Sequence, residues 1–200
     1  MTGLSTKALD TKTWPDFARL VEAHNGVWGG CWCMGFHAKG EGWGKSAELN
    51  REEKKSLVHE GRAHAALVYD GSECVGWCQF GSSDELPRIK NRRAYIAGDP
   101  DLPDWRITCF FSGSGYRGQG VAGAGLDGAL REIARLGGGR VEGYPEDTAG
   151  RKVSGSFLFN GALAMFERRH FERKRQIGKH KWVVQRTVEA ALKLKPEDTI

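Results

Sequence analysis

The feature of this sequence that most limits its possible folds is an apolar run that breaks into a glycine-rich turn and then a helical pattern. The apolar run covers residues 105–111, the turn is Arg117-Gly118-Gln119-Gly120-Val121-Ala122, and the helical pattern covers residues 121–136. A turn of this kind points backbone N–H groups outward, and the helix N-terminus adds partial positive charge. Gly118 and Gly120 permit close approach of a phosphate, and Arg117 adds a permanent cation. The segment therefore predicts a pyrophosphate site and a cofactor that carries a nucleotide.

A dinucleotide site is the main alternative. The spacing G-x-G-x-x-G starts at Gly113, Gly118 and Gly123, and Glu142 lies about 20 residues further on, where a dinucleotide fold places a ribose-binding acid. The sequence after Val141 lacks the further strand–helix alternation that a doubly wound sheet needs. An NAD(P)-binding oxidoreductase stays open as an alternative function.

Composition predicts one globular domain over residues 1–200, with its core at about residues 13–188. No signal peptide and no 18-residue apolar stretch is found, so we expect no membrane partner. The odd count of five cysteines favours free thiols in the cytoplasm. The net charge of +5 comes largely from clusters at residues 88–93 and 168–175, which we interpret as solvated faces. A nucleic-acid partner is not expected but is left open, as is a homodimer.

The pattern of elements predicts a mixed α/β (α+β) fold. We expect helices over residues 14–21 and 45–61, with a tryptophan-rich ordered loop at residues 25–44 between them. Residues 65–80 predict a hairpin around Asp70-Gly71, and residues 84–93 a short helix or loop. The glycine turn separates a strand from a long helix, and residues 140–144 predict the next strand. Phe159, Leu163 and Phe166 have helical spacing, residues 182–186 predict a last strand, and residues 193–200 a frayed tail.

Together the glycine turn and the order of elements resemble the GNAT superfamily, the GCN5-related N-acetyltransferases. The cofactor signature of that family is Arg or Gln, two residues, Gly, one residue, then Gly or Ala, and Arg117, Gly120 and Ala122 match it. The resemblance covers residues 14–187. It implies a mostly antiparallel central sheet flanked by helices, with the strand, glycine turn and helix as the cofactor unit. The stretch Glu167-Arg168-Arg169-His170-Phe171 is similar to the ending of the late helix, with His170 in place of a glycine.

The resemblance implies that acetyl-CoA, or another acyl-CoA, is a co-substrate and that an acyl group passes to an amine. The turn would hold the pyrophosphate, and the strand before it would bind the pantetheine arm and present the thioester to a backbone donor. We expect the cofactor to contact Cys109, Phe110, Phe111, Tyr116, Arg117, Gly118, Gln119, Gly120, Val121, Ala122, Asn160 and Phe166.

Two residues depart from the family pattern. The family often places a tyrosine on the late helix to protonate the CoA thiolate, and Phe166 stands at that position. The asparagine at the start of that helix is matched one position late, by Asn160. Phenylalanine cannot donate a proton. Either another group or water protonates the CoA thiolate, or the thiolate leaves without being protonated.

An amine nucleophile must lose a proton before it attacks. Glu142 is the best-placed acid for that role, and Tyr144 is the second candidate catalytic residue. Tyr144, Glu146 and Asp147 follow Glu142 at the end of the strand, and any of them could line the acceptor site. A structural role for Glu142 is an equally weighted alternative.

The loop around Cys31-Trp32-Cys33 predicts the acceptor side of the site. In the resembling fold, the early loop and the second helix commonly form a wall of the acceptor site. We therefore expect an aromatic pocket formed by Trp28, Cys31, Trp32, Cys33 and Met34, with Phe36 and Trp43 nearby, and core packing is the alternative. The two thiols and His37 supply too few ligands for a structural zinc, so we expect no metal.

The sequence thus predicts an N-acetyltransferase that moves an acetyl group from acetyl-CoA to a primary amine by direct attack in a ternary complex. A small-molecule acceptor is expected because the aromatic loop suggests an enclosed pocket, and a protein amine or aminoacyl-tRNA is the alternative acceptor. A non-catalytic acyl-CoA sensor is the alternative that keeps the same fold.

Overall fold

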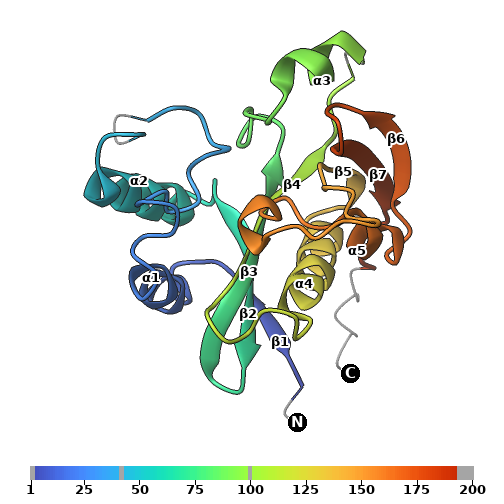
Figure 1. Ribbon diagram of the computed structural model, residues 1–200. Helices are drawn as coiled ribbons and strands as arrows, with labels where there is room; N and C mark the ends of the chain where they lie inside the picture. Colours follow the sequence, from blue (N-terminus) through green and yellow to red (C-terminus); the bar gives the residue numbers. More distant parts are fainter. Residues whose placement is uncertain (1–2, 41–42, 99–100, 193–200) are drawn as a thin grey trace, which may run out of the picture.

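The computed structural model describes residues 3–40, 43–98 and 101–192. Within them the chain forms α-helices, one short 3-10 helix (η1) and a single sheet (Figure 1). The predicted tail at residues 193–200 lies outside the described residues. The elements in chain order are β1 (Ser5–Ala8), α1 (Trp14–Glu22), α2 (Ala47–His59), β2 (His64–Asp70), β3 (Glu73–Ser82), α3 (Arg92–Gly98), β4 (Trp105–Ser112), α4 (Val121–Arg135), β5 (Gly139–Gly143), η1 (Gly155–Phe157), α5 (Leu163–Glu167), β6 (Glu172–Gln176) and β7 (Trp182–Val188).

The sheet has seven strands in the order β1-β2-β3-β4-β5-β7-β6. Neighbouring strands are antiparallel except for β4 and β5, which are parallel and are joined by α4. This confirms the predicted mostly antiparallel sheet with one strand–turn–helix–strand unit. It also excludes the doubly wound parallel sheet on which the dinucleotide alternative depended.

The parallel pairing of β4 and β5 is short. It runs from Trp105↔Val141 to Ile107↔Gly143, whereas β4 continues to Ser112. Beyond Gly143 the chain leaves β4 and instead pairs at Glu146 with Ala162 and Lys181. The second half of β4 is therefore bordered on that side by residues 158–160 rather than by a neighbouring strand, and this gap lies next to the glycine turn.

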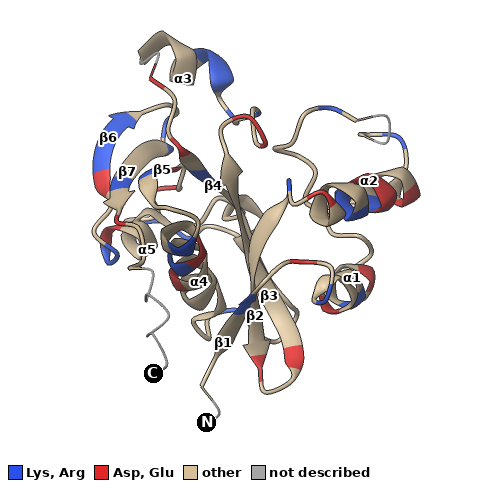
Figure 2. Cartoon of the chain, turned by 180° about the vertical axis from the view of Figure 1, so that it is seen from behind, with Lys and Arg blue, Asp and Glu red and all other residues tan. Residues whose placement is uncertain are grey.

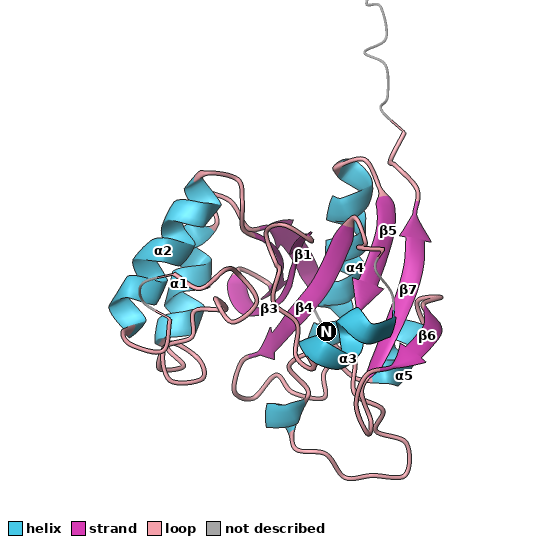
Figure 3. Cartoon of the chain, turned by 90° about the horizontal axis from the view of Figure 1, so that it is seen from above, coloured by secondary structure: helices cyan, strands magenta, loops and turns pink. Residues whose placement is uncertain are grey.

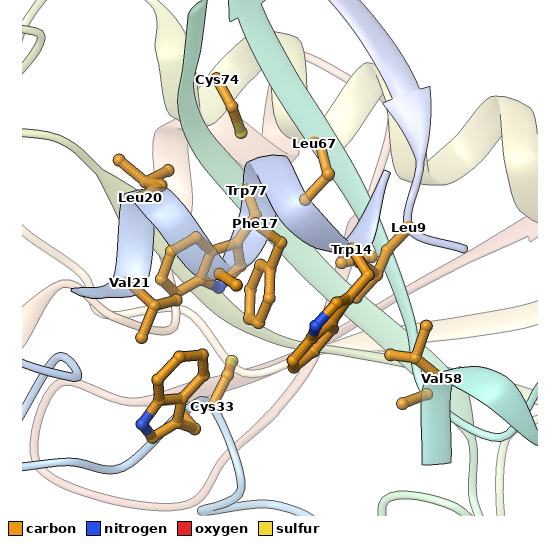
Figure 4. Close-up of a cluster of buried hydrophobic side chains, with 14 of the residues drawn as sticks. Leu9, Trp14, Phe17, Leu20, Val21, Cys33, Val58, Leu67, Cys74 and Trp77 are labelled. Carbon is orange, nitrogen blue, oxygen red and sulfur yellow. The ribbon is translucent and has the colours of Figure 1, made fainter. Parts of the chain in front are cut away.

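The sheet buries both of its faces, because alternate residues of β2 and β3 belong to different cores. Leu67 and Trp77 pack with α1 and the Cys33 loop in one core, whereas Ala66 and Cys78 pack with α4 in the other. Figure 3 shows α1 and α2 side by side next to the sheet. Figure 4 shows the first core, where Phe17 lies against Trp77 with ring centroids 5.0 Å apart. Trp32 of the tryptophan-rich loop packs against Trp14 and Phe17 of α1, so the loop is ordered against this core, as its composition predicted.

Several elements differ from the sequence prediction. The edge strands β1 and β6 and the 3-10 helix η1 were not predicted, and α3 begins only at the end of residues 84–93 rather than lying within them. The late helix is limited to Leu163–Glu167, so Phe159 precedes it. The basic stretch at residues 172–175 forms most of β6, which is largely blue in Figure 2, where Lys and Arg positions have that colour. Charged edge strands are common because charge discourages pairing with other chains. No helix among the described residues is long and apolar enough to span a membrane.

Candidate active site

The glycine turn forms an open set of backbone donors in front of α4. Gly118 and Gly120 have φ values of +77° and +85°, which favour glycine, and Gly120 is the N-cap residue of α4. Among the described residues, the N–H groups of residues 117–120 donate to no hydrogen-bond acceptor. Arg117 is exposed, and the first turn of α4 contains no acidic residue. This arrangement has the donors and the charge that an anionic group requires.

A cavity of about 640 Å³ begins at this turn and follows the end of β4. Arg117, Gly118 and Ala122 line it together with Phe110, Phe111 and Ser112. A second segment contributes Ser154, Gly155, Ser156, Leu158 and Phe159. The end of α1 adds His24, whose Nδ1 lies 2.8 Å from Leu20 O and whose Nε2 accepts the Ser114 N–H at 3.0 Å. Both nitrogens of His24 are therefore occupied, and its ring fixes the approach to the turn.

Phe159 and Asn160 form hydrogen bonds to β4 in the gap where β5 no longer pairs with it. The N–H of Phe110 donates to Phe159 O at 2.7 Å. The side chain of Asn160 donates through Nδ2 to Thr108 O and accepts at Oδ1 from Lys181 Nζ at 2.9 Å. Asn160 is 1% exposed, so in this structure it joins β4 to the β7 side of the sheet.

A second cavity, of about 360 Å³, continues from the first. The two cavities share Trp28, Ser156 and Phe159, and Trp28 and Phe159 make an edge-to-face contact with centroids 6.4 Å apart. The remaining lining is apolar or cationic and consists of Cys31, Cys33, Gly35, Phe36, Arg88, Ile89, Lys90 and Cys109. Trp28 is 56% exposed, which is unusual for tryptophan and places a large apolar ring at the rim shared by the cavities. The two cavities meet where Cys109 of β4 is followed by Phe110.

Behind the second cavity lies a buried polar network. Lys54 of α2 is 1% exposed, and its Nζ lies 2.7 Å from Gln79 Oε1 and 3.1 Å from His37 Nε2. Gln79 in turn donates to Thr108 Oγ1 at 3.1 Å. Burial lowers the pKa of Lys54, and burial and the adjacent Lys54 charge lower the pKa of His37 to about 2. His37 is therefore a neutral acceptor for Lys54 at ordinary pH.

The charge of Lys54 in this network also affects the pKa of the Cys33 thiol. Burial acts to raise the pKa of Cys33, but the hydrogen bond with Cys109 and the charge of Lys54 outweigh it and the pKa is lowered. The pKa of Cys109 is raised, first by the same hydrogen bond and then by burial. All five cysteines are free. The described residues contain no group of three or more His, Cys, Asp or Glu side chains that could hold a metal ion.

The predicted base Glu142 lies away from both cavities. It is 0% exposed, and its carboxylate accepts hydrogen bonds from Tyr95 Oη at 2.8 Å, Tyr144 Oη at 2.9 Å and Gln185 Nε2 at 2.7 Å. Burial and the Glu142 charge raise the pKa of Tyr144, which keeps that hydroxyl a donor. The structure therefore does not bring Glu142 and Tyr144 to the acceptor side, and both make contacts of a structural kind.

Only some of the residues predicted to contact the cofactor line the first cavity. Five of them line the first cavity, namely Phe110, Phe111, Arg117, Gly118 and Ala122. Cys109 lines the second cavity instead. Gln119 and Gly120 belong to the exposed turn, while Val121 is buried and Tyr116 donates to Glu73 at 3.2 Å. Phe166 is 0% exposed and packs edge-on against Phe110 and Phe171, so its side chain is closed off from a ligand in this structure.

The predicted acceptor residues also divide. Trp28, Cys31 and Cys33 line the second cavity, and so does Phe36. Trp32 and Met34 are 3% and 2% exposed and belong to the core, with Trp32 stacked on Trp14 at 6.1 Å between ring centroids. For these two residues the alternative of core packing is the correct one.

Sequence reasoning missed several residues that line the second cavity, among them Arg88, Lys90, Ser156 and Phe159. Arg88 and Lys90 were assigned to a solvated face, and Phe159 to a helix. Phe36 O accepts the N–H of Arg88 at 3.1 Å, which brings the 88–90 segment against the aromatic loop. The alternation Arg88-Ile89-Lys90, with a buried Ile89 in its centre, is a signal that this segment is attached to the core.

No family model matches the sequence, and no curated protein matches it. Solved structures do match the fold. RimL, the ribosomal L7/L12 alpha-N-protein acetyltransferase in complex with coenzyme A, aligns over 96% of this chain and 97% of its own with a TM-score of 0.52 and 17% identity. Histone acetyltransferase HPA2 and related acetyltransferase from Corynebacterium glutamicum aligns over 94% and 98% at a TM-score of 0.51 and 19% identity.

A protein assigned to the GNAT family from Desulfovibrio desulfuricans aligns over 93% of this chain and 99% of its own, with a TM-score of 0.50 and 13% identity. At these identities the likeness concerns the backbone. The mostly antiparallel seven-stranded sheet flanked by helices agrees with it. This chain has the fold of the GNAT acetyltransferases.

Proposed function

We propose that the protein is an N-acetyltransferase that transfers an acetyl group from acetyl-CoA to a primary amine of a small molecule. The observation that carries the proposal is the turn at residues 117–120, with unpartnered N–H groups at one end of a cavity that follows β4 into a second cavity. Such a layout provides one place for the cofactor, one for an acceptor, and a junction between them. Direct attack in a ternary complex is the corresponding mechanism.

The cofactor would lie along the first cavity. The pyrophosphate would accept hydrogen bonds from the turn and pair with Arg117, and the pantetheine arm would pass Phe110 and Phe111. The thioester would then reach the junction at Trp28, Ser156 and Phe159. In the structure, Phe110 N–H already donates to Phe159 O, so cofactor entry would exchange that bond for one with the arm or the thioester oxygen.

The acceptor amine would lose its proton without a carboxylate in the cavity. Among the described residues that line the second cavity there is no Asp or Glu, whereas Arg88 and Lys90 are present. A nearby positive charge disfavours an ammonium ion and so lowers the pKa of the amine. The free amine can then attack the thioester carbonyl, with water taking the proton, and the CoA leaves as a thiolate, which is a stable leaving group.

The size of the second cavity favours a small acceptor. About 360 Å³ lies at the lower end of the range of about 300–1,000 Å³ that is usual for small-molecule sites. A protein amine is the alternative acceptor, because the RimL neighbour is described as acting on ribosomal L7/L12. The free cysteines fit a reducing cytoplasm as the place of action.

The test is an initial-rate study with acetyl-CoA and a panel of primary amines. Turnover with a small amine, and rates that give intersecting double-reciprocal lines, would support direct transfer in a ternary complex. Parallel lines would contradict that mechanism and indicate an acyl-cysteine intermediate. CoA binding without turnover of any small amine or peptide would favour the sensor.

A further inference from the structure

The second cavity is lined by a charged side chain, Arg88, that has one unsatisfied hydrogen-bond donor among the described residues. This donor is Nη1, which is buried. The side chain is held in place, because its guanidinium carbon lies 4.6 Å from the centroid of the Trp43 ring. Its backbone N–H is bound by Phe36 O at 3.1 Å. An unsatisfied buried donor on a charged group is costly, so a ligand that supplies an acceptor gains affinity.

The charged side chains among the described residues that line the second cavity, Arg88 and Lys90, are both positive. Lys90 Nζ lies 5.3 Å from the centroid of Phe159, on the wall that the two cavities share. The remaining lining includes the rings of Trp28 and Phe36 and the side chain of Ile89, which are suited to an apolar body. Polyamines and other cationic acceptors would meet repulsion from Arg88 and Lys90.

We propose that the acceptor is an amino carboxylate with an apolar or aromatic body, whose carboxylate binds Arg88. A planar guanidinium matches a carboxylate in a bidentate geometry, and the stacking on Trp43 keeps the fork oriented. The apolar body would fill the space between Phe36, Ile89 and Phe159, and the amine would point to the junction beside Cys109. The inference rests on the proposed function for the identity of the reaction, but the carboxylate site itself does not.

A binding experiment tests the carboxylate site without catalysis. Phenylacetate and its neutral counterpart phenylacetamide are titrated into the protein by calorimetry in the absence of CoA. The inference predicts that phenylacetate binds about tenfold more tightly, or better, because a hydrogen bond to a charged group is worth about 1.5–3 kcal/mol. In Arg88→Gln the preference should disappear, whereas Arg62→Gln, at an exposed arginine paired with Glu60, should behave as the wild type.

A kinetic experiment tests the substrate class. Acetyl transfer is compared between phenylalanine and 2-phenylethylamine, which lacks the carboxylate. The inference predicts a kcat/KM about tenfold or more in favour of phenylalanine, and Arg88→Gln should remove that advantage through KM.

The two experiments separate the possible failures. Equal turnover of both amines, unchanged by Arg88→Gln, would overturn the inference and leave the proposed function in place. Lack of any transfer, together with phenylacetate binding that requires Arg88, would contradict the proposed function and support the carboxylate site. Equal binding of phenylacetate and phenylacetamide would overturn the carboxylate site.

Discussion

At the scale of single residues, the protonation state of His37, behind the second cavity, affects the free energy of unfolding. His37 is 3% exposed and accepts from Lys54, which also contacts Gln79. These side chains join the aromatic loop, α2 and β3, so a change in charge at His37 acts on three segments at once. The low pKa of His37 has a direct consequence for acid stability.

We expect His37 to cause loss of stability in acid. Its pKa falls from 6.5 to about 2 on folding, so below pH 6.5 the unfolded chain binds a proton that the folded chain does not. The free energy of unfolding should therefore decrease as the pH falls through 6.5, by roughly 3 kcal/mol at pH 4.5 from this group. Urea unfolding of the wild type and His37→Gln between pH 4.5 and 7.5 measures it, and parallel pH curves for the two proteins would contradict the assignment.

Some site residues were predictable and others were not, for physical reasons. Trp28, Cys31 and Cys33 were predicted because the early loop of the resembling fold commonly forms a wall of the acceptor site, and this loop is rich in aromatic side chains. Arg88 was missed because a basic run is normally solvated, and only the tertiary contact with the aromatic loop turns it inward. Glu142 was misplaced because periodicity identifies a strand but does not say what covers each of its faces.

At the scale of elements, β5 and α5 pack closely because Gly143 of β5 has no side chain where it meets Phe166 of α5. A Cβ on Gly143 would lie 2.8 Å from Cζ and 3.0 Å from Cδ1 of Phe166, which is fully buried. Phe166 thus acts as a packing residue against β5 and β4. A packing role of this kind is compatible with phenylalanine at a position where the resembling family often has tyrosine.

Gly143→Ala should destabilise the fold by about 1–3 kcal/mol, because the added methyl overpacks a filled contact. In a Phe166→Leu background the same change should cost less, since the smaller side chain leaves room. Denaturant unfolding of the four proteins in this double-mutant cycle measures the coupling. Equal costs of Gly143→Ala in both backgrounds would contradict the contact.

The start of α2 depends on a side-chain cap. Ser46 Oγ accepts the N–H of Leu49 at 3.2 Å, and Ser46 has extended backbone angles, as an N-cap residue does. We expect Ser46→Ala to lower the free energy of unfolding by about 1 kcal/mol. Ser56→Ala, in the exposed interior of the same helix, is the control and should be nearly neutral. If both changes have the same effect, the cap has no special role.

Element prediction succeeded where a pattern had a clear period. The amphipathic α4 and the hairpin of β2 and β3 were predicted close to their observed bounds. β6 was missed because its residues are almost all exposed and basic, so it lacks the apolar alternation that marks a strand. His170, which replaces a glycine of the family pattern, has a φ of +61°. The left-handed conformation that favours glycine is therefore kept without the glycine itself.

At the scale of the molecule, both cavities of the proposed active site lie where the strands β4 and β5 separate. β4 and β5 pair only as far as Ile107↔Gly143, and both cavities are lined by residues of β4 beyond that point. The sequence predicted the fold through the order of elements around one glycine turn. It predicted the loop around Cys31-Trp32-Cys33 as one side of an acceptor pocket, but not the segments at residues 88–90 and 156–159 that complete the second cavity, because they lie far from that loop in the chain.

The central claim is that the turn before α4 binds the pyrophosphate of CoA, and calorimetric titration with CoA tests it most directly. The wild type should bind CoA, and Gly120→Leu should lose at least tenfold in affinity, because the side chain would stand in front of the donors and strain a φ of +85°. Gly150→Leu is the matched control, since Gly150 also has a positive φ of +67° and open space, but lies outside the lining of both cavities. Folding of each variant is checked by its thermal unfolding. A folded wild type that does not bind CoA, or a folded Gly120→Leu that binds it equally well, would contradict the account.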